Sequence, residues 1–180
     1  MKLMFASDIH GDLICCKNMV DIYFREKAEK LILLGDILYH GPRNDIPDGY
    51  NPKCVAAMLN KYKNELLCVR GNCDAEVDQM MLEFPILADY MVMWLGGKMI
   101  FATHGHIYNT SNPPMLKSGD ILIHGHTHIP TAEEHDGYVY INPGSVSLPK
   151  NGNKKSYMIF EDNTFIIKSL SGENIIKYKV

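Results

Sequence analysis

The sequence has few of the features that mark membrane, secreted or nucleic-acid-binding proteins. No segment of its 180 residues approaches the roughly 20 apolar residues that a membrane-spanning helix requires. The apolar run Leu3 to Ala6 is too short for the core of a signal peptide. Lysine and arginine number 18 against 21 aspartates and glutamates, so no basic excess indicates a nucleic-acid surface. We therefore expect a cytoplasmic protein with no membrane segment and no strong nucleic-acid signal.

Paired cysteines are also missing from the sequence. The five cysteines are odd in number, and none forms a C-x-x-C pair, so we expect a reducing compartment and mostly buried, inert thiols. One stretch, LCVRGNCDAE from Leu67 to Glu76, keeps two interpretations open. Either Cys68 and Cys73 form a metal or redox pair, or the functional residue is Asn72 between them.

No internal repeat, low-complexity tract or linker divides the chain. Its composition, with 46% hydrophobic and 22% charged residues, is that of an ordinary globular protein. A chain of this length buries roughly two-thirds of the surface that it exposes when unfolded. We therefore predict one domain that spans residues 1–180.

The first half of the chain alternates short apolar strands with amphipathic helices. A helix over residues 13–27 places Leu13, Cys16, Val20 and Phe24 on one face, and a second helix is expected to begin after Asn51. Alternation of this kind implies parallel strands joined by right-handed crossovers. The strands predicted in this half are residues 2–6, 30–34 and 65–69.

After Pro85 the pattern changes to strands joined by hairpin turns. Turn residues occur at Gly96-Gly97, at Asp136-Gly137 and at residues 161–163. The two halves together predict an α/β (α+β) fold, in which two mixed sheets pack face to face with helices outside. The later strands are predicted at residues 90–95, 98–103, 120–123, 138–142, 156–160, 164–170 and 175–180.

Polar residues follow five of the predicted strands at the point where each strand ends. Ligands of α/β sheets bind in the crevice beyond the carboxyl ends of the strands, so these distant segments can converge on one site. Glycines at the same points, among them Gly35, Gly71 and Gly125, permit sharp turns. The side chains able to bind a metal ion are Asp8, His10, Asp36, Asn72, His104, His126 and His128.

This ligand set favours two divalent ions over one. Carboxylate and amide oxygens combined with imidazole nitrogens suit manganese, iron or zinc, and seven ligands exceed the needs of one tetrahedral ion. If Asp36 bridges two ions, each ion receives four protein ligands. Two such ions lower the pKa of a bound water and stabilise an in-line phosphoryl displacement. Capping of a turn or helix would explain any one of these motifs, but it is a poor explanation of all five.

The ordered motifs resemble the signature of the calcineurin-like metallophosphoesterase superfamily. Within it, the resemblance is greatest to the small bacterial YfcE-type phosphodiesterases and extends along essentially the whole chain. The superfamily motifs are Ser7-Asp8-Ile9-His10, Gly35-Asp36, Gly71-Asn72, His104 and Gly125-His126-Thr127-His128. The closer likeness is carried by KLMFASDIHGD near the start, HGPRN at 40–44, RGNCD at 70–74, and the segments 76–79 and 142–147.

The resemblance implies a four-layer α/β/β/α sandwich with two divalent ions between the sheet ends. The implied reaction is hydrolysis of a phosphate diester by a metal-bound hydroxide, with Asp36 and Asn72 among the catalytic residues. The residues implied for the first ion are Asp8, His10, Asp36 and His128. Those implied for the second are Asp36, Asn72, His104 and His126.

Three further residues are candidates for contact with the substrate. A guanidinium matches phosphate oxygens bidentately, so Arg43 is expected to bind the ester, with Asn44 as a weaker candidate beside it. A surface role for Arg43 in its proline-containing turn stays open. Cys73 occupies the position where much of the superfamily has a histidine proposed to protonate the leaving group. The identity of the general acid is therefore open, since a thiol with a pKa of about 8.5 differs from an imidazolium.

We expect two divalent ions as cofactors, with Mn²⁺ first and Zn²⁺, Fe²⁺, Ni²⁺ or Mg²⁺ acceptable to the same ligands. The expected partner is a small phosphate ester, and a homo-oligomer stays open. Two alternatives remain. One is a phosphomonoesterase or nuclease with the same site; the other is a non-catalytic protein-interaction scaffold, as in the retromer subunit of this fold. The complete set of ligand positions argues against the scaffold.

Overall fold

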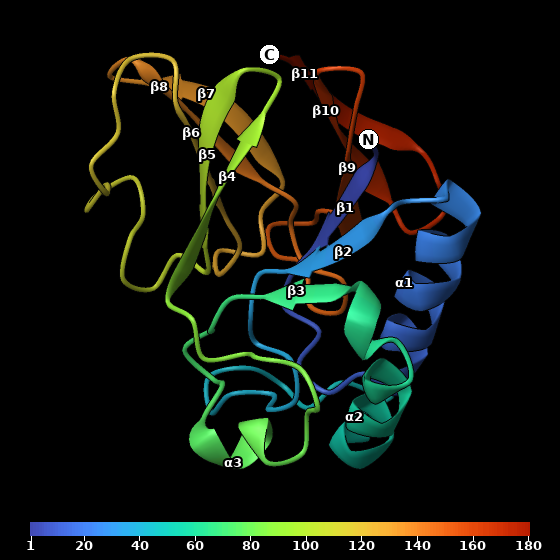
Figure 1. Cartoon of the computed structure of the whole chain (residues 1–180). Helices are drawn as coiled ribbons and strands as arrows, with labels where there is room; N and C mark the ends of the chain where they lie inside the picture. Colours follow the sequence, from blue (N-terminus) through green and yellow to red (C-terminus); the bar gives the residue numbers. More distant parts are fainter.

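The computed structural model describes residues 1–180 and contains two β-sheets and a small number of helices (Figure 1). The helices are α1 (Leu13–Glu26), α2 (Pro52–Asn60), the 3-10 turn η1 (Lys63–Glu65) and the short α3 (Glu76–Gln79). The strands are β1 (Leu3–Ala6), β2 (Lys30–Leu33), β3 (Leu66–Cys68), β4 (Tyr90–Leu95), β5 (Lys98–Thr103), β6 (Ile121–His124), β7 (Thr131–His135), β8 (Tyr138–Asn142), β9 (Ser156–Glu161), β10 (Thr164–Ser169) and β11 (Asn174–Lys179).

Both sheets are mixed, which confirms the predicted fold class. The six-stranded sheet has the order β11-β10-β9-β1-β2-β3, and the five-stranded sheet has the order β4-β5-β6-β8-β7. In the first sheet β1, β2 and β3 pair in parallel, and in the second β5, β6 and β8 do so. Each sheet therefore brings together the carboxyl ends of several parallel strands at one edge.

Alternation along the central strands explains how the layers pack. In β1, Met4 and Ala6 belong to the core under the helices, whereas Leu3 and Phe5 belong to the core between the sheets. Successive side chains of a strand point to opposite faces, so a strand that is buried on both faces is apolar throughout. The central core draws on β5, β6 and β8 of the second sheet as well, and this shared core holds the two sheets together.

The helices begin where the sequence provides capping residues. Asp12 accepts a hydrogen bond from the Cys15 N–H at 3.0 Å, and Asn51 accepts one from the Cys54 N–H at 3.2 Å. Pro52 follows in the first turn of α2, where its missing N–H has no cost. Both helices lie over the outer face of the six-stranded sheet, on the side away from the second sheet (Figure 1).

The outer face of the five-stranded sheet is covered differently from the predicted helical layer. No helix follows α3 in the chain. A small cluster of buried residues, Phe101, Leu122, Tyr138 and Tyr140, packs there against Tyr108 and Leu116 from the segment between β5 and β6. The fourth layer is thus a loop, because the segment between these parallel strands is rich in asparagine, serine and proline. No helix is long and apolar enough to cross a membrane.

Candidate metal centre

The loops that follow β1, β2, β3, β5 and β6 meet at one edge of the sandwich. The Asp8 N–H donates to the Gly35 carbonyl at 3.1 Å, and the His10 N–H donates to the Asp36 carbonyl at 2.9 Å, so the first two loops lie side by side. His104 Nδ1 donates to the Leu34 carbonyl at 2.7 Å, which joins the loop after β5 to the end of β2. The two sheets are therefore connected at the site as well as through the core.

Five of the seven predicted ligands have a left-handed backbone conformation. Their φ angles lie between 48° and 63°. For residues other than glycine this conformation costs of order 1–3 kcal/mol each, and it persists only where the surroundings enforce it. Half of the ten non-glycine residues with positive φ are candidate ligands, which indicates that these turns are shaped to direct side chains, at some cost in stability. The five residues are Asp8, His10, Asp36, His126 and His128.

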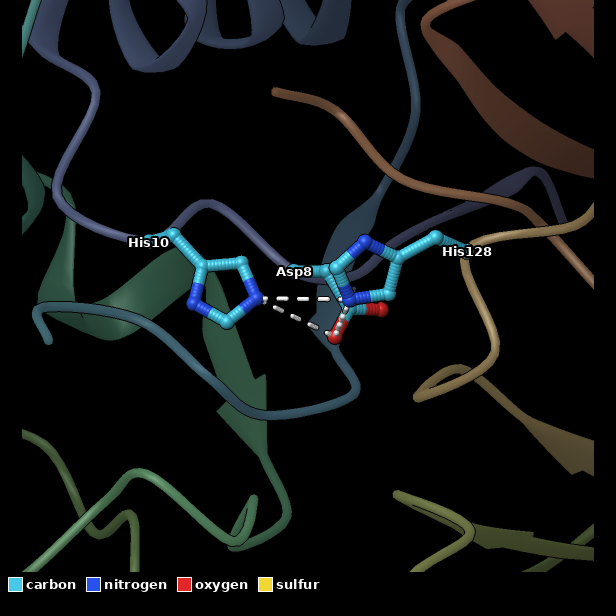
Figure 2. A group of neighbouring side chains, drawn as sticks. All are labelled: Asp8, His10 and His128. Atoms are coloured by element: carbon cyan, nitrogen blue, oxygen red, sulfur yellow. Dashed lines mark hydrogen bonds and ion pairs between the residues drawn. The ribbon is translucent and has the colours of Figure 1, made fainter. Parts of the chain in front are cut away.

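One group of side chains consists of Asp8, His10 and His128 (Figure 2). His128 Nε2 lies 3.2 Å from Asp8 Oδ1, and His10 Nε2 lies 3.7 Å from the same oxygen. The two ring nitrogens are 3.4 Å apart. All three residues are buried, and Figure 2 shows both rings directed at the carboxylate from separate segments of the chain.

A second group forms around Asp36 and His104. His104 Nε2 lies 3.5 Å from Asp36 Oδ2, 3.0 Å from Asn72 Oδ1 and 3.2 Å from His126 Nδ1. The four residues that the resemblance implied for the second ion therefore direct oxygen or nitrogen atoms at one another.

Asp36 lies between the two groups. Its Oδ2 is 3.7 Å from His10 Nε2 and 3.5 Å from His104 Nε2. Its other oxygen accepts a hydrogen bond from the Cys73 N–H at 2.8 Å. Asp8 is held in the same way, because its Oδ2 accepts from the His126 N–H at 3.1 Å. Each carboxylate thus has one oxygen fixed by the backbone and one oxygen directed into the cluster.

Backbone carbonyls set the tautomers of three histidines. Nδ1 of His10, His104 and His128 contacts the carbonyls of Tyr39, Leu34 and Leu148 at 2.9, 2.7 and 2.6 Å. A carbonyl only accepts, so each Nδ1 carries a hydrogen, and Nε2 is the ring nitrogen that a metal ion would take in place of a proton. Histidines that ligate metal ions are commonly oriented by such hydrogen bonds.

The charges of the cluster also fit a divalent cation. Asp8 Oδ1 is buried and accepts no hydrogen bond, even though His128 Nε2 lies beside it. Burial would raise the pKa of Asp8, but its pairing with His128 and the charge of His104 hold this pKa well below its usual range. Burial would lower the pKa of His104, but the pairing with Asp36 raises it to about 9. The carboxylates therefore stabilise positive charge next to them, which a bound metal ion would supply.

Asp74 is a site-organising residue to which the sequence assigned no role. Its Oδ2 accepts from the N–H groups of Asp36 and Gly71 at 2.8 and 2.7 Å, and its Oδ1 accepts from the Ile37 N–H at 2.9 Å. Burial and the charge of Asp36, opposed by these three donors, raise the pKa of Asp74 to about 6. Asp74 fastens the loop after β2 to the loop after β3. Its place in RGNCD, one residue after Cys73, was the only signal in the sequence.

The last residue of β8 and the segment that follows this strand form hydrogen bonds that keep the remaining loops in place. The hydroxyls of Ser145 and Ser147 both donate to the Asp8 carbonyl at 2.9 Å. Asn142 Nδ2 donates to the Gly125 carbonyl at 2.8 Å and to Thr127 Oγ1 at 2.9 Å. The parallel pairing of β8 with β6 brings the end of a sixth strand to the same edge, although it contributes none of the predicted metal ligands.

The two cysteines of LCVRGNCDAE do not form a pair. All five cysteines are free, and Cys68 is buried in the core under the helices. Cys73 instead groups with His10 and Asp36, with ligand atoms within 4.8 Å of one another. Burial and the nearby charge of Asp36 raise the pKa of the Cys73 thiol far above its ordinary value, so the thiol keeps its proton. Asn72 Oδ1 lies 3.0 Å from His104 Nε2, which favours the second interpretation, in which Asn72 is the functional residue of this stretch.

A polar cavity of about 310 Å³ opens over the cluster. Asp36, Asn72, His126 and His128 line it together with the predicted substrate residues Arg43 and Asn44. Asn44 Nδ2 donates to the His40 carbonyl at 2.9 Å, which fixes its loop. Lys150, from the loop after β8, lines the cavity as well, although no sequence motif selected it.

Two further histidines, His106 and His124, are adjacent to the cluster. His124 stacks on Tyr140, with ring centroids 4.3 Å apart, and its Nδ1 donates to the Gly125 carbonyl at 3.0 Å. The ring of His106 lies 5.4 Å from that of His104. Both support the neighbouring rings by packing, and His124 also fixes the glycine turn before His126.

Comparison with known proteins shows the family to which the chain belongs. The model of the calcineurin-like phosphoesterase superfamily domain matches residues 1–164, so the chain belongs to this superfamily. The chain is 46% identical over 176 residues to phosphodiesterase YfcE of Escherichia coli strain K12, which covers 98% of this chain and 96% of that protein. The solved structure of YfcE, a phosphoesterase from E. coli, matches with a TM-score of 0.96 at 44% identity, covering 99% and 98% of the two chains.

A more distant likeness concerns the fold alone. The structure of vacuolar protein sorting 29 from Cryptosporidium parvum matches with a TM-score of 0.62 at 17% identity, covering 99% of this chain and 98% of that one. At this identity the shared architecture does not favour a scaffold role over an enzyme, because function is determined by the residues of the site.

Proposed function

We propose that this chain hydrolyses phosphate diesters at a centre of two divalent metal ions, with Mn²⁺ as the ion it uses. Its superfamily and its 46% identity to a phosphodiesterase over nearly the full length make it a phosphoric ester hydrolase. The observation that carries the dinuclear proposal is the position of Asp36 Oδ2, 3.7 Å from one group's His10 and 3.5 Å from the other group's His104.

The proposed ligands follow the two groups. The first ion would be held by Asp8, His10, Asp36 and His128, and the second by Asp36, Asn72, His104 and His126. When bound, the ions would supply a water of lowered pKa and neutralise the charge on the phosphoryl oxygens. All seven residues direct oxygen or nitrogen atoms into one cluster, which supports their proposed role as ligands.

The residues of the chain itself would bind and orient the ester. Arg43 presents a planar guanidinium at the cavity, where it would pair with two oxygens of the phosphate, and Asn44 would donate to a third. Lys150 adds a second cation from another loop. Asp74 keeps the loops that carry Asp36 and Asn72 at a fixed separation, so that the attacking and leaving oxygens remain in line with phosphorus.

Cys73 is the proposed proton donor to the leaving group. Its thiol stays protonated beside Asp36, but it is a weak acid. An enzyme that relies on this donor should hydrolyse esters of acidic alcohols much faster than esters of alkyl alcohols.

We also propose that residues 1–180 act as one metallophosphoesterase domain in the cytoplasm, on small esters. Candidate ligands from the loops after β1, β2, β3, β5 and β6 and supporting residues after β8 contribute to a single site, which supports one functional unit. Five free cysteines suit a reducing compartment.

The edge strand β4, which exposes Trp94, is the proposed contact face of a homo-oligomer.

Turnover against a panel of esters tests this function. The protein would be treated with a chelator and then assayed with Mn²⁺, Zn²⁺, Fe²⁺, Ni²⁺ or Mg²⁺ on aryl and alkyl diesters, on monoesters and on a short DNA. We expect Mn²⁺-dependent cleavage of diesters, fastest for the aryl esters. Faster cleavage of monoesters or DNA would favour the phosphomonoesterase or the nuclease. No turnover of any ester at full metal occupancy would leave the scaffold as the better interpretation.

A further inference from the structure

A second cavity lies directly beside the polar one. Its volume is about 340 Å³, and its walls are mostly apolar, with Tyr39, Tyr50, Val77 and Met81 among them. Cys73 lines both cavities. The apolar groove, as we call this second cavity, therefore begins at a residue that belongs to the metal cluster.

The two cavities differ in the surface that they offer to a ligand. The polar cavity is lined by carboxylate, amide, imidazole and basic side chains, so it offers little apolar surface. In the apolar groove Lys53 and Asp78 are the charged residues, and their opposite charges leave the walls without a net charge. The first cavity thus suits a phosphate and the second suits an uncharged organic group.

Large apolar side chains are exposed around the apolar groove. Tyr39 is 42% exposed, Met81 45% and Val77 64%. Scattered apolar residues are ordinary on a protein surface, but a contiguous set next to a binding site marks a place for a ligand. Tyr39 is also tied to the cluster, because its carbonyl accepts the hydrogen bond from His10 Nδ1 at 2.9 Å.

We propose that the apolar groove is a subsite for an apolar ester group, aromatic or branched, of the phosphate diester. This inference rests on the proposed function, and it specifies the substrate class of the same site. A diester carries two organic groups next to the phosphorus, and neither finds apolar surface in the polar cavity. A group that extends past Cys73 enters the apolar groove, where Tyr39, Val77 and Met81 exclude water from it.

Two diesters that differ in one group test the subsite. Methyl p-nitrophenyl phosphate and phenyl p-nitrophenyl phosphate share a leaving group and a charge, and the second ester group is larger and more apolar in the phenyl ester. Comparison of each variant with the unmodified chain on the same diester cancels the difference in their intrinsic reactivity. Steady-state kinetics with Mn²⁺ would give kcat/KM for each diester. Turnover of the methyl ester by the unmodified chain reports the proposed function separately from the subsite.

Met81→Gln is the variant that probes the apolar groove. Glutamine has nearly the length of methionine, and the Met81 carbonyl is anchored by Asn60 Nδ2 at 2.9 Å, so the backbone should stay in place. Met80→Gln is the matched control. Met80 is the neighbouring residue, is 84% exposed and does not line the apolar groove. Thermal unfolding of both variants checks that the fold is intact.

We expect Met81→Gln to lower kcat/KM for the phenyl ester by about 5- to 10-fold, mainly through KM, and to leave the methyl ester within about twofold. Met80→Gln should change neither. An equal loss for both esters would mean that the shared p-nitrophenyl group occupies the groove, which also supports an ester subsite. Unchanged kinetics of Met81→Gln would overturn the proposal. A Met81→Gln effect on oligomeric state alone, measured by sedimentation, would assign the groove to a second copy of the chain and overturn it too.

If the unmodified chain cleaved neither diester with Mn²⁺ bound, the proposed function would fail and the subsite with it. Cleavage of both diesters with no dependence on Met81 would remove the subsite alone. The two failures are therefore distinct.

Discussion

Two clusters of charge in this molecule, one partly buried around Glu26 and one buried around Asp8 and Asp36, are built from different partners. At the end of α1, Glu26 is paired with Lys2 at 2.8 Å and Lys168 at 2.7 Å, and it accepts a hydrogen bond from the Tyr157 hydroxyl at 2.8 Å. At the other cluster, Asp8 and Asp36 form ion pairs with histidines and with no lysine or arginine.

The difference shows which of the two clusters has its charge balanced by side chains of the protein itself. Around Glu26, Lys2 and Lys168 face two carboxylates, because Lys2 also pairs with Glu161 at 3.2 Å, so the network is balanced in charge and serves stability. Around Asp8 and Asp36, the neighbours are imidazoles that can be neutral, and one carboxylate oxygen accepts no hydrogen bond. A group of carboxylates that lacks a permanent cation favours a divalent ion, because burying a charge without a partner is costly.

The strongest test of this comparison is Asp36→Asn. The amide keeps an oxygen that can accept the Cys73 N–H, but it removes the charge shared between the two groups. We expect turnover to fall by about a thousandfold or more and bound metal to decrease, with the fold intact. Diester kinetics, elemental analysis of metal and circular dichroism would measure the three effects. Full metal occupancy with retained activity would remove Asp36 from the bridging role.

Metal addition should stabilise the intact site. At a free Mn²⁺ concentration of about 100 times Kd, the free energy of unfolding should rise by about 2.7 kcal/mol. For a chain of this size, that is a rise in Tm of roughly 5–10 °C. Thermal melts with Mn²⁺ and with a chelator would measure it. Asp36→Asn should show a smaller increment, and an equal increment would indicate binding elsewhere.

Glu26→Gln should destabilise the fold and leave the site unaffected. Its carboxylate has two lysines and a tyrosine as partners, and their loss leaves Lys2 and Lys168 without this shared charge. We expect a loss of about 2 kcal/mol in the free energy of unfolding, measured by urea denaturation. The Mn²⁺-dependent kcat of the folded variant should be unchanged.

The pH dependence of the stability difference between the original chain and Glu26→Gln tests whether charge causes that difference. Burial would raise the pKa of Glu26, but Lys168, Lys2 and Tyr157 lower it to about 2 from an ordinary 4.5. A carboxylate with a lowered pKa in the folded state stabilises above its ordinary pKa and loses this effect as pH falls towards the folded value. The gap between the original chain and Glu26→Gln should be constant near neutral pH and narrow below pH 4.5. A constant gap down to pH 3 would mean that packing, and not charge, causes it.

The smallest expected effect is that of Arg43→Ala. Arg43 is exposed at the polar cavity and forms no ion pair within the chain, in contrast to Lys168, so its loss should not change stability. We expect KM for a diester to rise by about 10-fold with little change in kcat. Lys150→Ala is the matched comparison from the other loop. If the kinetics of Arg43→Ala equalled those of the unmodified chain, Arg43 would be a surface residue with no contact to the substrate.

Much of the candidate site could be predicted from the sequence, because the patterns that locate its residues lie within short segments of the chain. An apolar run followed by Asp-x-His or Gly-Asp predicts a strand and the side chains at its end, and the parallel order of the early strands predicts that these ends meet. The seven candidate ligands are brought together as expected. The hairpins at Gly96-Gly97 and Asp136-Gly137 also form where the turn residues predict them.

Other parts depend on contacts that no local pattern contains. Asp74 fixes a loop 38 residues away, and Ser145 fixes the Asp8 carbonyl across 137 residues. The helical cover expected on the second sheet is replaced by a loop, since Tyr108 and Leu116 from the segment between β5 and β6 pack on that face without a helix.

Short segments of the sequence specify the types of the candidate ligands, their order and the strand ends that carry them, because side-chain chemistry and strand periodicity are local properties. Three other properties follow from the packing of the whole chain: which oxygen of Asp36 is directed into the cluster, the position of Cys73 between a polar cavity and an apolar groove, and the pairing of Glu26 with lysines where Asp8 is paired with histidines. Those properties arise where loops from distant strands pack against one another, and the geometry of such packing is set by the whole fold.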